Sequence, residues 1–393
     1  MAQPGLHRCT ILPSYLLQQV AFNGSEPQRR SALTTLLLDE GFRAARAAAG
    51  GPRGWPGIGS AAEGVVNRAI YDAHNTQQLP GTLVRSEGDP DTSDVAVNEA
   101  YAGLGDTYRL YAEQYQRDSI DDQGMPLLGT VHYDEAYDNA FWNGSQMVFG
   151  DGDGQLFNRF TISLDVIGHE LTHGVTEHEA ALAYLGQSGA LNESISDVFG
   201  SLVKQYASQT TAADADWLIG QGLLTDHVNG VALRSMKAPG TAYDDPVLGK
   251  DPQPSTMAGY VVTSSDNGGV HINSGIPNHA FYLVATELGG YAWEKAGRIW
   301  YETLLSPGIT PKVDFRGFAR LTAASAAQLY GAASAEAKAV DDAWRAVGVL
   351  PVGATALSAL TTGGQAQNTV TASSTSPWRA GAPGSGPGEH PAE

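Results

Sequence analysis

His169-Glu170-Leu171-Thr172-His173 is the most informative segment of this 393-residue chain. Apolar residues around it recur at helical spacing, so a helix is predicted here. Residues four apart lie on one face of a helix, and both imidazoles can therefore reach one ion. Glu170 projects close to the same point and can act on a metal-bound water without binding the metal. A surface helix with two solvated histidines is the alternative, which the flanking apolar residues disfavour.

The third ligand has to come from elsewhere, because a catalytic zinc needs three protein ligands and one open position. A histidine ten residues after His169 would complete one known pattern, but position 179 is a glutamate and His178 is one residue out of register. The helical stretch 189–197 offers a carboxylate instead. Glu193 would be the ligand, and Asp197, one turn further on, can hold a ligand histidine by its other ring nitrogen. An N-capped surface helix is the alternative here.

Composition limits the class of protein. The chain is 42% hydrophobic with a net charge of −19, which argues against nucleic acid or an anionic membrane as a partner. No window approaches 18 consecutive apolar residues, so no membrane span is expected. The apolar stretch 10–20 is interrupted by proline and polar residues, and it does not resemble a secretory signal. Cys9 is the only cysteine, which excludes an intrachain disulfide.

The chain divides by composition into four sections. Residues 1–49 form a small head with one predicted helix, 28–49, and residues 50–57 form a glycine- and proline-rich linker. The main body covers 55–351, and 352–393 is predicted to be a disordered tail because it has few large apolar residues. The first 50 residues carry five arginines against three carboxylates. Their net charge of +2 leaves −21 for the remainder, which suggests that head and body attract each other.

Within the body, the first hundred residues mix a helix with short strands. A helix is predicted over 97–116 and strands over 127–133 and 146–149. The Asp151–Gly154 stretch is predicted to be a solvated turn, with calcium binding there as an alternative. From residue 161 onward the apolar pattern becomes helical, over 162–175 and again over 191–202.

Three further segments resemble those of the thermolysin family of metallopeptidases. They are Asn139-Ala140-Phe141-Trp142-Asn143-Gly144, the segment 266–275 (DNGGVHINSG) and Leu233-Arg234-Ser235-Met236, and Glu193 lies 20 residues after His173. The resemblance covers most of 55–350. It implies an α+β fold with a β-rich N-terminal lobe (55–185) that carries the His169–His173 helix. A mainly helical C-terminal lobe (186–351) follows, with zinc in the cleft between the lobes.

The resemblance also implies roles for individual residues. Zinc would be bound by His169, His173 and Glu193, with Asn192 and Asp197 holding the two histidines, and Glu170 would be the general base. The oxyanion would be stabilised by His271 and Tyr184, with Asp266 holding His271 in its charged form. Substrate backbone would be bound by Asn139, the carbonyl of Ala140, and Arg234. An apolar pocket for the residue after the cut would be lined by Phe157, Phe160, Val166, Ile219 and Leu233. Cleavage before large apolar residues is expected.

The sequence departs from this family at its double calcium site. Asp165 and Asp216 stand at matching positions, but Lys204, Leu218 and Gln221 replace expected carboxylates. Calcium needs six to eight oxygen ligands. We therefore expect that this calcium site is lost and that Lys204 pairs with Asp165 or Asp216.

The head also departs from thermolysin. The segment that opens with Cys9-Thr10-Ile11-Leu12-Pro13-Ser14-Tyr15 resembles the short propeptide of protealysin-like members of the family. This implies a zymogen whose head lies in the active-site cleft as an intramolecular inhibitor and is removed near the linker. Cys9 is either a thiolate ligand of zinc or a small buried apolar residue.

These observations predict a zinc-dependent endopeptidase that acts on polypeptides, works as a monomer and, by resemblance, is extracellular; a cytoplasmic location is the alternative. One competing hypothesis is an inactive zinc protein that binds peptides, but no catalytic group is missing. Another is a purely structural zinc, which would normally have a fourth protein ligand, and none is apparent.

Overall fold

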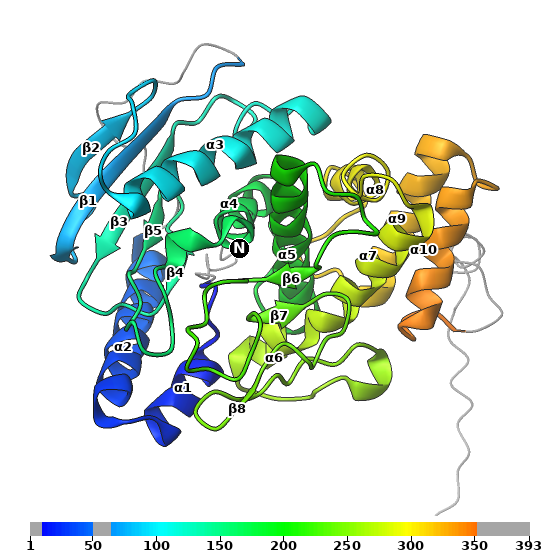
Figure 1. Ribbon diagram of the computed structural model, residues 1–393. Coiled ribbons are helices and arrows are strands. Elements are labelled where there is room, and N and C mark those ends of the chain that lie inside the picture. Colours follow the sequence, from blue (N-terminus) through cyan, green and yellow to red (C-terminus); the bar gives the residue numbers. More distant parts are fainter. Residues whose placement is uncertain (1–9, 50–63, 352–393) are drawn as a thin grey trace, which may run out of the picture.

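The computed structural model describes residues 10–49 and 64–351, with the side chains of 42–49 left out (Figure 1). The predictions made for Cys9, for the linker 50–57 and for the tail 352–393 fall outside these residues. The described part has a sheet-containing N-terminal portion and a helical C-terminal portion, so the predicted α+β architecture is confirmed. Among the described helices, none is long and apolar enough to cross a membrane.

A five-stranded mixed sheet forms the N-terminal portion. Its strands are β1 (Arg68–Thr76), β2 (Thr82–Ser86), β3 (Leu127–Tyr133), β4 (Ala140–Trp142) and β5 (Met147–Phe149), in the order β2-β1-β3-β5-β4. β3 is parallel to β1 and β5, and β4 pairs antiparallel with β5. β4 therefore lies at one edge of the sheet, where its outer side can bind another extended chain.

Helix α3 (Val95–Tyr115) packs against the sheet, as the apolar pattern over 97–116 predicts. The Asp94 side chain caps its first turn by accepting hydrogen bonds from the amides of Ala96 and Val97. The predicted strands 127–133 and 146–149 are found as β3 and β5, with β5 beginning one residue later.

Helices α4 (Leu164–Glu179) and α5 (Gly186–Ser208) form the centre of the molecule and pack closely on each other. Their close approach depends on glycine. A Cβ atom on Gly200 would lie only 2.3 Å from the carbonyl oxygen of Asp165. Because the two backbones can meet here, the inward side chains of both helices face one small volume.

The C-terminal portion surrounds this pair with short strands and further helices. The strands are β6 (Leu218–Ile219), β7 (Arg234–Ser235), β8 (Asp244–Asp245) and β9 (Gly249–Lys250). The α-helices are α6 (Asp266–Asn273), α7 (Gly275–Leu288), α8 (Ala296–Leu304), α9 (Phe315–Tyr330) and α10 (Ala335–Ala346), with 3₁₀ turns η1 (Phe160–Ile162) and η2 (Met257–Gly259). Buried Trp300 and Trp344 stack with ring centroids 6.2 Å apart and join α8 to α10.

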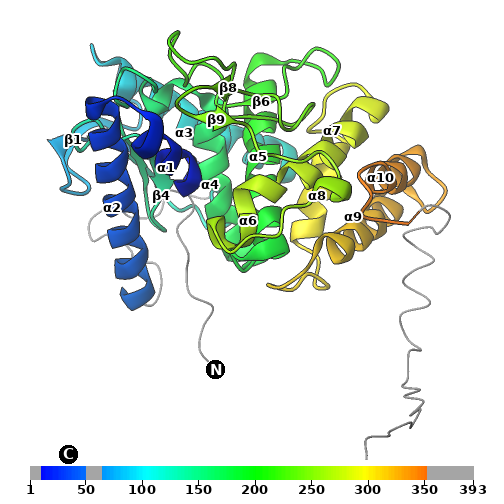
Figure 2. The ribbon, with the colours of Figure 1, turned by 90° about the horizontal axis from the view of Figure 1, so that it is seen from below.

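The head contains two helices, α1 (Ser14–Asn23) and α2 (Glu26–Ala49), where the sequence predicted one. No helix was predicted over 14–23, although Pro13 stands directly before the first turn, where a proline is tolerated. Leu16, Leu17 and Val20 of α1 are buried. Figures 1 and 2 both place the head beside the edge of the sheet that β4 forms.

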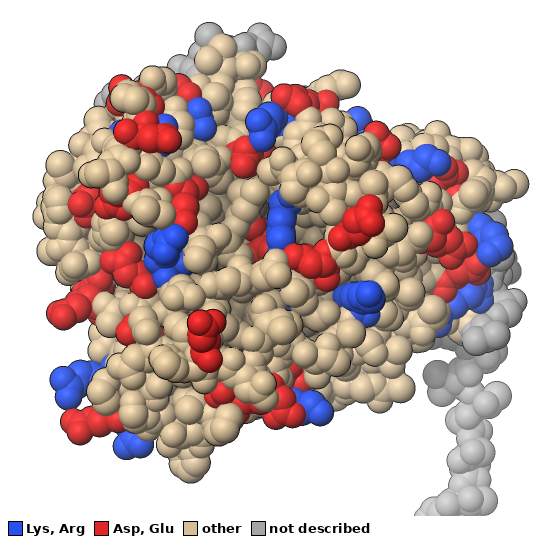
Figure 3. Space-filling view, viewed as in Figure 1, with Lys and Arg blue, Asp and Glu red and all other residues tan. Residues whose placement is uncertain are grey.

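Charged side chains are scattered over the face shown in Figure 3. Basic side chains are interspersed among the acidic ones on this face, with no extended basic area. The basic residues Arg29 and Arg30 bond to Gly24 and Glu26 of the head itself. These two arginines therefore do not provide the attraction that was expected between a basic head and an acidic body.

Candidate metal centre and active-site cleft

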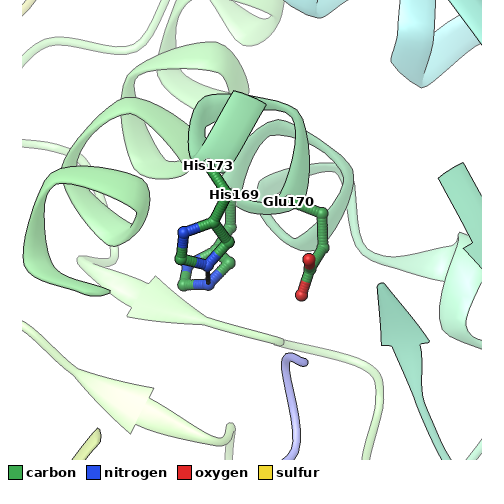
Figure 4. Close-up of side chains that lie close together, drawn as sticks. All are labelled: His169, Glu170 and His173. Atoms are coloured by element: carbon green, nitrogen blue, oxygen red, sulfur yellow. Dashed lines mark hydrogen bonds between the residues drawn. The ribbon is translucent and has the colours of Figure 1, made fainter. Parts of the chain in front are cut away.

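His169 and His173 point from one face of α4 towards the same point (Figure 4). Their Nε2 atoms lie 3.0 Å apart, and both side chains are buried. Ligand atoms at about 2.0–2.1 Å from a tetrahedral zinc lie roughly 3.3 Å from one another. The histidine pair thus has the separation that a shared zinc requires.

Glu193 brings a carboxylate to the same point from α5. One of its oxygens lies 3.5 Å from Nε2 of His169 and the other 3.5 Å from Nε2 of His173. The side chain is 1% exposed, and its Oε2 has no hydrogen-bond partner among the described residues. A buried carboxylate is costly unless it is paired or bound to a metal, so these residues fit a zinc ion.

The other ring nitrogen of each histidine is fixed by a neighbour on α5. Nδ1 of His169 lies 2.8 Å from Asp197 Oδ1, and Nδ1 of His173 lies 2.8 Å from Asn192 Oδ1. Ser196 Oγ is also 3.0 Å from Nδ1 of His173, a contact that the sequence did not reveal. An acceptor at Nδ1 leaves Nε2 unprotonated and free to bind a metal.

Burial and the neighbouring charges set the protonation of this cluster. Burial would lower the pKa of His169, but Asp197 and Glu193 raise it to about 9. Burial lowers the pKa of His173 to about 3. Burial would raise the pKa of Glu193, but the surrounding histidines hold it well below its usual range. The cluster therefore carries an ionised carboxylate and at least one neutral imidazole, both of which are metal-binding forms.

Asp197 connects the histidines to a second part of the cleft. Its oxygens accept two hydrogen bonds from Arg234, at 2.9 and 2.8 Å, and one from Asn278 of α7, at 2.8 Å. Burial would raise the pKa of Asp197, but Arg234 and His169 hold it at about 2. Asn278 was not predicted, because nothing in the sequence near it indicates a contact with a residue 81 positions away.

Glu170 lies beside the histidines, and its carboxylate points to the same side of α4 as the two imidazoles (Figure 4). The amide of Trp142 donates a 3.1 Å hydrogen bond to Oε2, while Oε1 has no partner among the described residues. Burial raises the pKa of Glu170 to about 8. One carboxylate oxygen is thus fixed by the edge strand, and the other remains available to take up a proton.

His271 and Tyr184 lie beside the carboxylate of Glu193, with Nε2 of His271 3.5 Å from Glu193 Oε2. Nε2 of His271 is 3.1 Å from the Tyr184 hydroxyl, which also donates to Glu193. Asp266 Oδ1 lies 2.6 Å from Nδ1 of His271, and burial, which would lower the pKa of His271, is outweighed by Glu193 and Asp266, which raise it. Positive φ angles from Asp266 to Gly269 bend the chain so that Asp266 can reach back to His271.

Three backbone units of the head lie in this cleft. The Ile11 amide donates to the Ala140 carbonyl at 3.2 Å, and the Leu12 amide donates to Asn139 Oδ1 at 3.0 Å. Arg234 Nη1 donates to the Ile11 carbonyl at 3.2 Å, and Asn139 Nδ2 donates to the Leu12 carbonyl at 3.4 Å. Thr10 pairs antiparallel with Phe141 of β4, and its carbonyl oxygen is 3.2 Å from His271 Nε2.

Helix α2 holds the head on the loop before β4. Ser31 Oγ donates to Asp138 Oδ2 at 2.5 Å, and Thr35 Oγ1 accepts from the Asp138 amide at 3.1 Å. Asp39 accepts from the Tyr137 hydroxyl at 2.6 Å and from Asn139 Nδ2 at 3.0 Å. These three head residues were missed, although their spacing of four places them on one face of a helix.

The five residues expected to line an apolar pocket are all buried and belong to the main hydrophobic core; they are Phe157, Phe160, Val166, Ile219 and Leu233. The Leu233 amide bonds to the Ile219 carbonyl at 2.9 Å, and β6 pairs with β7, so two of the five residues stand beside Arg234.

Lys204 occupies the place where the sequence departs from the calcium-binding pattern. Its Nζ lies 3.1 Å from Asp165 Oδ2 and 2.7 Å from Asp216 Oδ2, so it pairs with both carboxylates. It also reaches the Leu218 carbonyl and Gln221 Oε1. In the turn after β5, Asp151 pairs with His132, and Asp153 Oδ1 accepts from three amides that follow it.

Comparison with known proteins agrees with this geometry. Residues 62–177 match the thermolysin metallopeptidase catalytic domain, and residues 180–349 match the thermolysin metallopeptidase alpha-helical domain. The chain is 55% identical to an extracellular metalloprotease of Pectobacterium carotovorum, over 87% of this chain and 96% of that protein. It is 50% identical to protease PrtS of a Photorhabdus strain, over 86% and 91% of the two chains.

A solved structure extends the likeness to the head. The precursor of protealysin, a metalloproteinase from Serratia proteamaculans, superposes with a TM-score of 0.80 at 55% identity. The match covers 87% of this chain and all of that one. The chain therefore belongs to the thermolysin family of zinc metallopeptidases, among its protealysin-like members.

Proposed function

We propose that this metallopeptidase is an extracellular endopeptidase made as a zymogen, with zinc bound by His169, His173 and Glu193. The observation that carries the proposal is the pair of Nε2 atoms 3.0 Å apart with Glu193 at 3.5 Å from each. A bound zinc supplies an activated water and polarises the carbonyl under attack. The extracellular assignment rests on the printed name of a relative.

The chain's own residues supply the remaining chemistry. Glu170 takes a proton from the attacking water and delivers it to the leaving amine, which its free Oε1 permits. His271, charged beside Asp266, and Tyr184 donate hydrogen bonds to the oxyanion as it forms. Asn139, Ala140 and Arg234 hold the substrate backbone, as they hold the backbone of the head. Asn192 and Asp197 keep the two histidines oriented.

Two finer features belong to the same proposal. The pocket of Phe157, Phe160, Val166, Ile219 and Leu233 favours a large apolar residue after the cut, since burying such a side chain is favourable. Residues 1–49 act as an intramolecular inhibitor, because the cleft's backbone-binding groups are already occupied by the head. The enzyme is proposed to act as a monomer with a catalytic lobe over 55–185 and a helical lobe over 186–351.

Casein hydrolysis tests the proposal directly. Full-length protein and protein lacking residues 1–50 are compared, each with and without a zinc chelator, and the product peptides are sequenced. We expect chelator-sensitive activity that rises when the head is absent, with cuts mainly before Leu, Ile, Phe and Val. A preference for charged residues directly after the cleaved bond would contradict the proposed apolar pocket. Zinc-loaded, folded protein that is inactive in both forms would favour a peptide-binding role.

Raising the pH should weaken the docking of the head. Burial under α2 and the nearby Asp153 carboxylate raise the pKa of Asp138 to about 8. Once the head leaves, water reaches Asp138 and its pKa falls towards the ordinary value of about 3.9. The docked state therefore binds the proton more tightly, so docking is strongest at acidic pH and is lost as the pH rises to about 8.

The affinity of the head for the body falls by at most about tenfold per pH unit, and the fall levels off above pH 8. The rate of conversion of precursor to mature enzyme, measured from pH 6 to 9, reports it. Asp138→Asn should flatten this dependence, because the amide cannot ionise. Ser145→Ala, at a half-buried site in the loop after β4, serves as a control. An unchanged pH dependence in Asp138→Asn would contradict the assignment.

Calcium should not stabilise this protein at the Lys204 site. The Lys204 ammonium already neutralises Asp165, which is fully buried, and Asp216. We expect the melting temperature to be insensitive to added calcium, and Lys204→Met to destabilise by roughly 1–3 kcal/mol because it leaves a buried carboxylate without its cation. Lys250→Met, at an exposed position, is the matched control. A rise of several degrees in the wild type on adding calcium would show that the site still binds the ion.

A further inference from the structure

We infer that the Thr10–Ile11 peptide bond is itself a cleavage site, which the enzyme hydrolyses slowly in its own cleft while the rest of the head stays bound. This inference rests on the proposed function. It concerns the register of the head in the cleft, meaning which of its peptide bonds stands where a substrate bond is cut.

The contacts of the head fix that register. The carbonyl that faces the oxyanion donor His271 is that of Thr10, at 3.2 Å. The next amide, of Ile11, donates to the Ala140 carbonyl, and the next carbonyl, of Ile11, accepts from Arg234. The following amide, of Leu12, donates to Asn139. Each group proposed to bind substrate therefore bonds the head in chain order, and the bond after the Thr10 carbonyl stands at the position of attack.

The side chains agree with the same register. The residue that follows the bond is Ile11, which is large, apolar and completely buried, and its carbonyl is bonded by Arg234, the neighbour of Leu233 in the chain. An isoleucine is the type of residue that this pocket is proposed to accept. The free Oε1 of Glu170 provides the base on the same side of β4, whose amide at Trp142 holds the other oxygen.

The proposed step is an ordinary hydrolysis. The oxygen of a water adds to the Thr10 carbonyl carbon, the bond from that carbon to the Ile11 nitrogen breaks, and Glu170 passes a proton to the departing nitrogen. The products are a carboxylate at Thr10 and an amine at Ile11. No oxidant, reductant or second substrate is needed.

The docked head explains why such a cut would not release the enzyme. The new amine at Ile11 belongs to a segment that remains bound by Arg234 and Asn139. Further along, the same segment is held through Ser31 and Asp39 of α2, which bond to Asp138 and Asn139. Leu16, Leu17 and Val20 of α1 stay buried as well. The product is therefore held in place, blocks the cleft and slows any second turnover until the head is removed.

The test follows the N-terminus of the full-length, zinc-loaded chain by intact mass and N-terminal sequencing, at protein concentrations that span a hundredfold. We expect a species that begins at Ile11, formed at a rate independent of concentration and with casein activity as low as that of the intact chain. Ile11→Pro removes the donated amide and should abolish this species. Gln18→Ala, on the exposed side of α1, should retain it.

Amide hydrogen exchange in the zinc-free full-length protein gives a second measurement that needs no turnover. The Ile11 and Leu12 amides should be protected, and the Leu12 amide should lose its protection in Asn139→Ala. Unprotected amides in a folded protein would overturn the register.

The outcomes separate the inference from the proposed function. A Thr10–Ile11 bond that stays intact overturns the inference when the same preparation shows chelator-sensitive casein hydrolysis after trypsin has cut at Arg53 and has then been inhibited, and the proposed function then stands. A cut whose rate rises with protein concentration also overturns it, because one molecule is then cutting another. An intact bond without casein hydrolysis after trypsin overturns both.

Discussion

Glu170→Gln should lower kcat for peptide hydrolysis about 10²- to 10⁴-fold in the protein lacking the head, with little change in KM. The carboxylate of Glu170 is fully buried, and one of its oxygens is fixed by the Trp142 amide while the other has no partner among the described residues. Glutamine keeps the size and the hydrogen bond from Trp142 but cannot accept a proton. The chemical step is therefore lost and substrate binding is kept.

The measurement needs three readings on one preparation: kcat and KM on a peptide substrate, bound zinc, and the melting temperature. Zinc content should remain at one per chain, since Glu170 is proposed to activate water rather than to bind the metal. Glu177→Gln, two turns along the same helix and only half-buried, is the matched control and should keep its activity. Near-normal kcat in Glu170→Gln would remove Glu170 from the role of base.

Asp39→Ala should weaken the docking of the head by about 2–5 kcal/mol, or roughly 30- to 5,000-fold. Asp39 is 2% exposed, and its two oxygens accept hydrogen bonds from Tyr137 and Asn139 of the body. Hydrogen bonds to a buried carboxylate are stronger than neutral ones, and alanine removes both acceptors at once. The uncut precursor should then show much higher activity on added peptides than the wild-type precursor.

The activity of a Glu40→Ala precursor separates this effect from a general change in charge, because Glu40 is the exposed neighbour of Asp39 on α2. Asp39→Asn, which keeps one acceptor oxygen, should lie between the two. The mature enzymes of all three variants should be identical in rate, because the position is absent from them. If Asp39→Ala and wild-type precursors are equally inhibited, the docking contact on α2 is not what keeps the cleft closed.

Spacing along the chain predicted the part of the site that depends on local geometry, and the resemblance to a family supplied the expected residues on other elements. The spacing of His169 and His173 on a helix determines that their rings face one way, whatever surrounds them. Contacts between distant segments were not accessible in this way. Asn278 reaches Asp197 across 81 residues, and Asp39 reaches Asn139 across 100, because the packing of whole helices brings them together.

The head shows the same difference between what the sequence could and could not predict. Its position in the cleft was expected from a resemblance, while the means of docking was not. The net charge of +2 suggested attraction between opposite charges, but Arg29 and Arg30 bond within the head. The contacts that the structure shows between α2 and the body come from Ser31, Thr35 and Asp39, two hydroxyl side chains and a buried carboxylate on one helical face. Composition gives the sign of the net charge of a segment, but it does not reveal which face of the segment contacts the rest of the protein.

The position of β4 at the rim of the sheet bears on how the protein behaves before it is mature. An unpaired edge strand is a template on which extended segments of other chains can form further strands, and it is a recognised cause of aggregation. In this protein the head covers it through Thr10 and Ile11. Thr10 and Ile11 would thus also protect the precursor from aggregation through β4. β4 itself is only three residues long, which limits the hazard once that cover is gone.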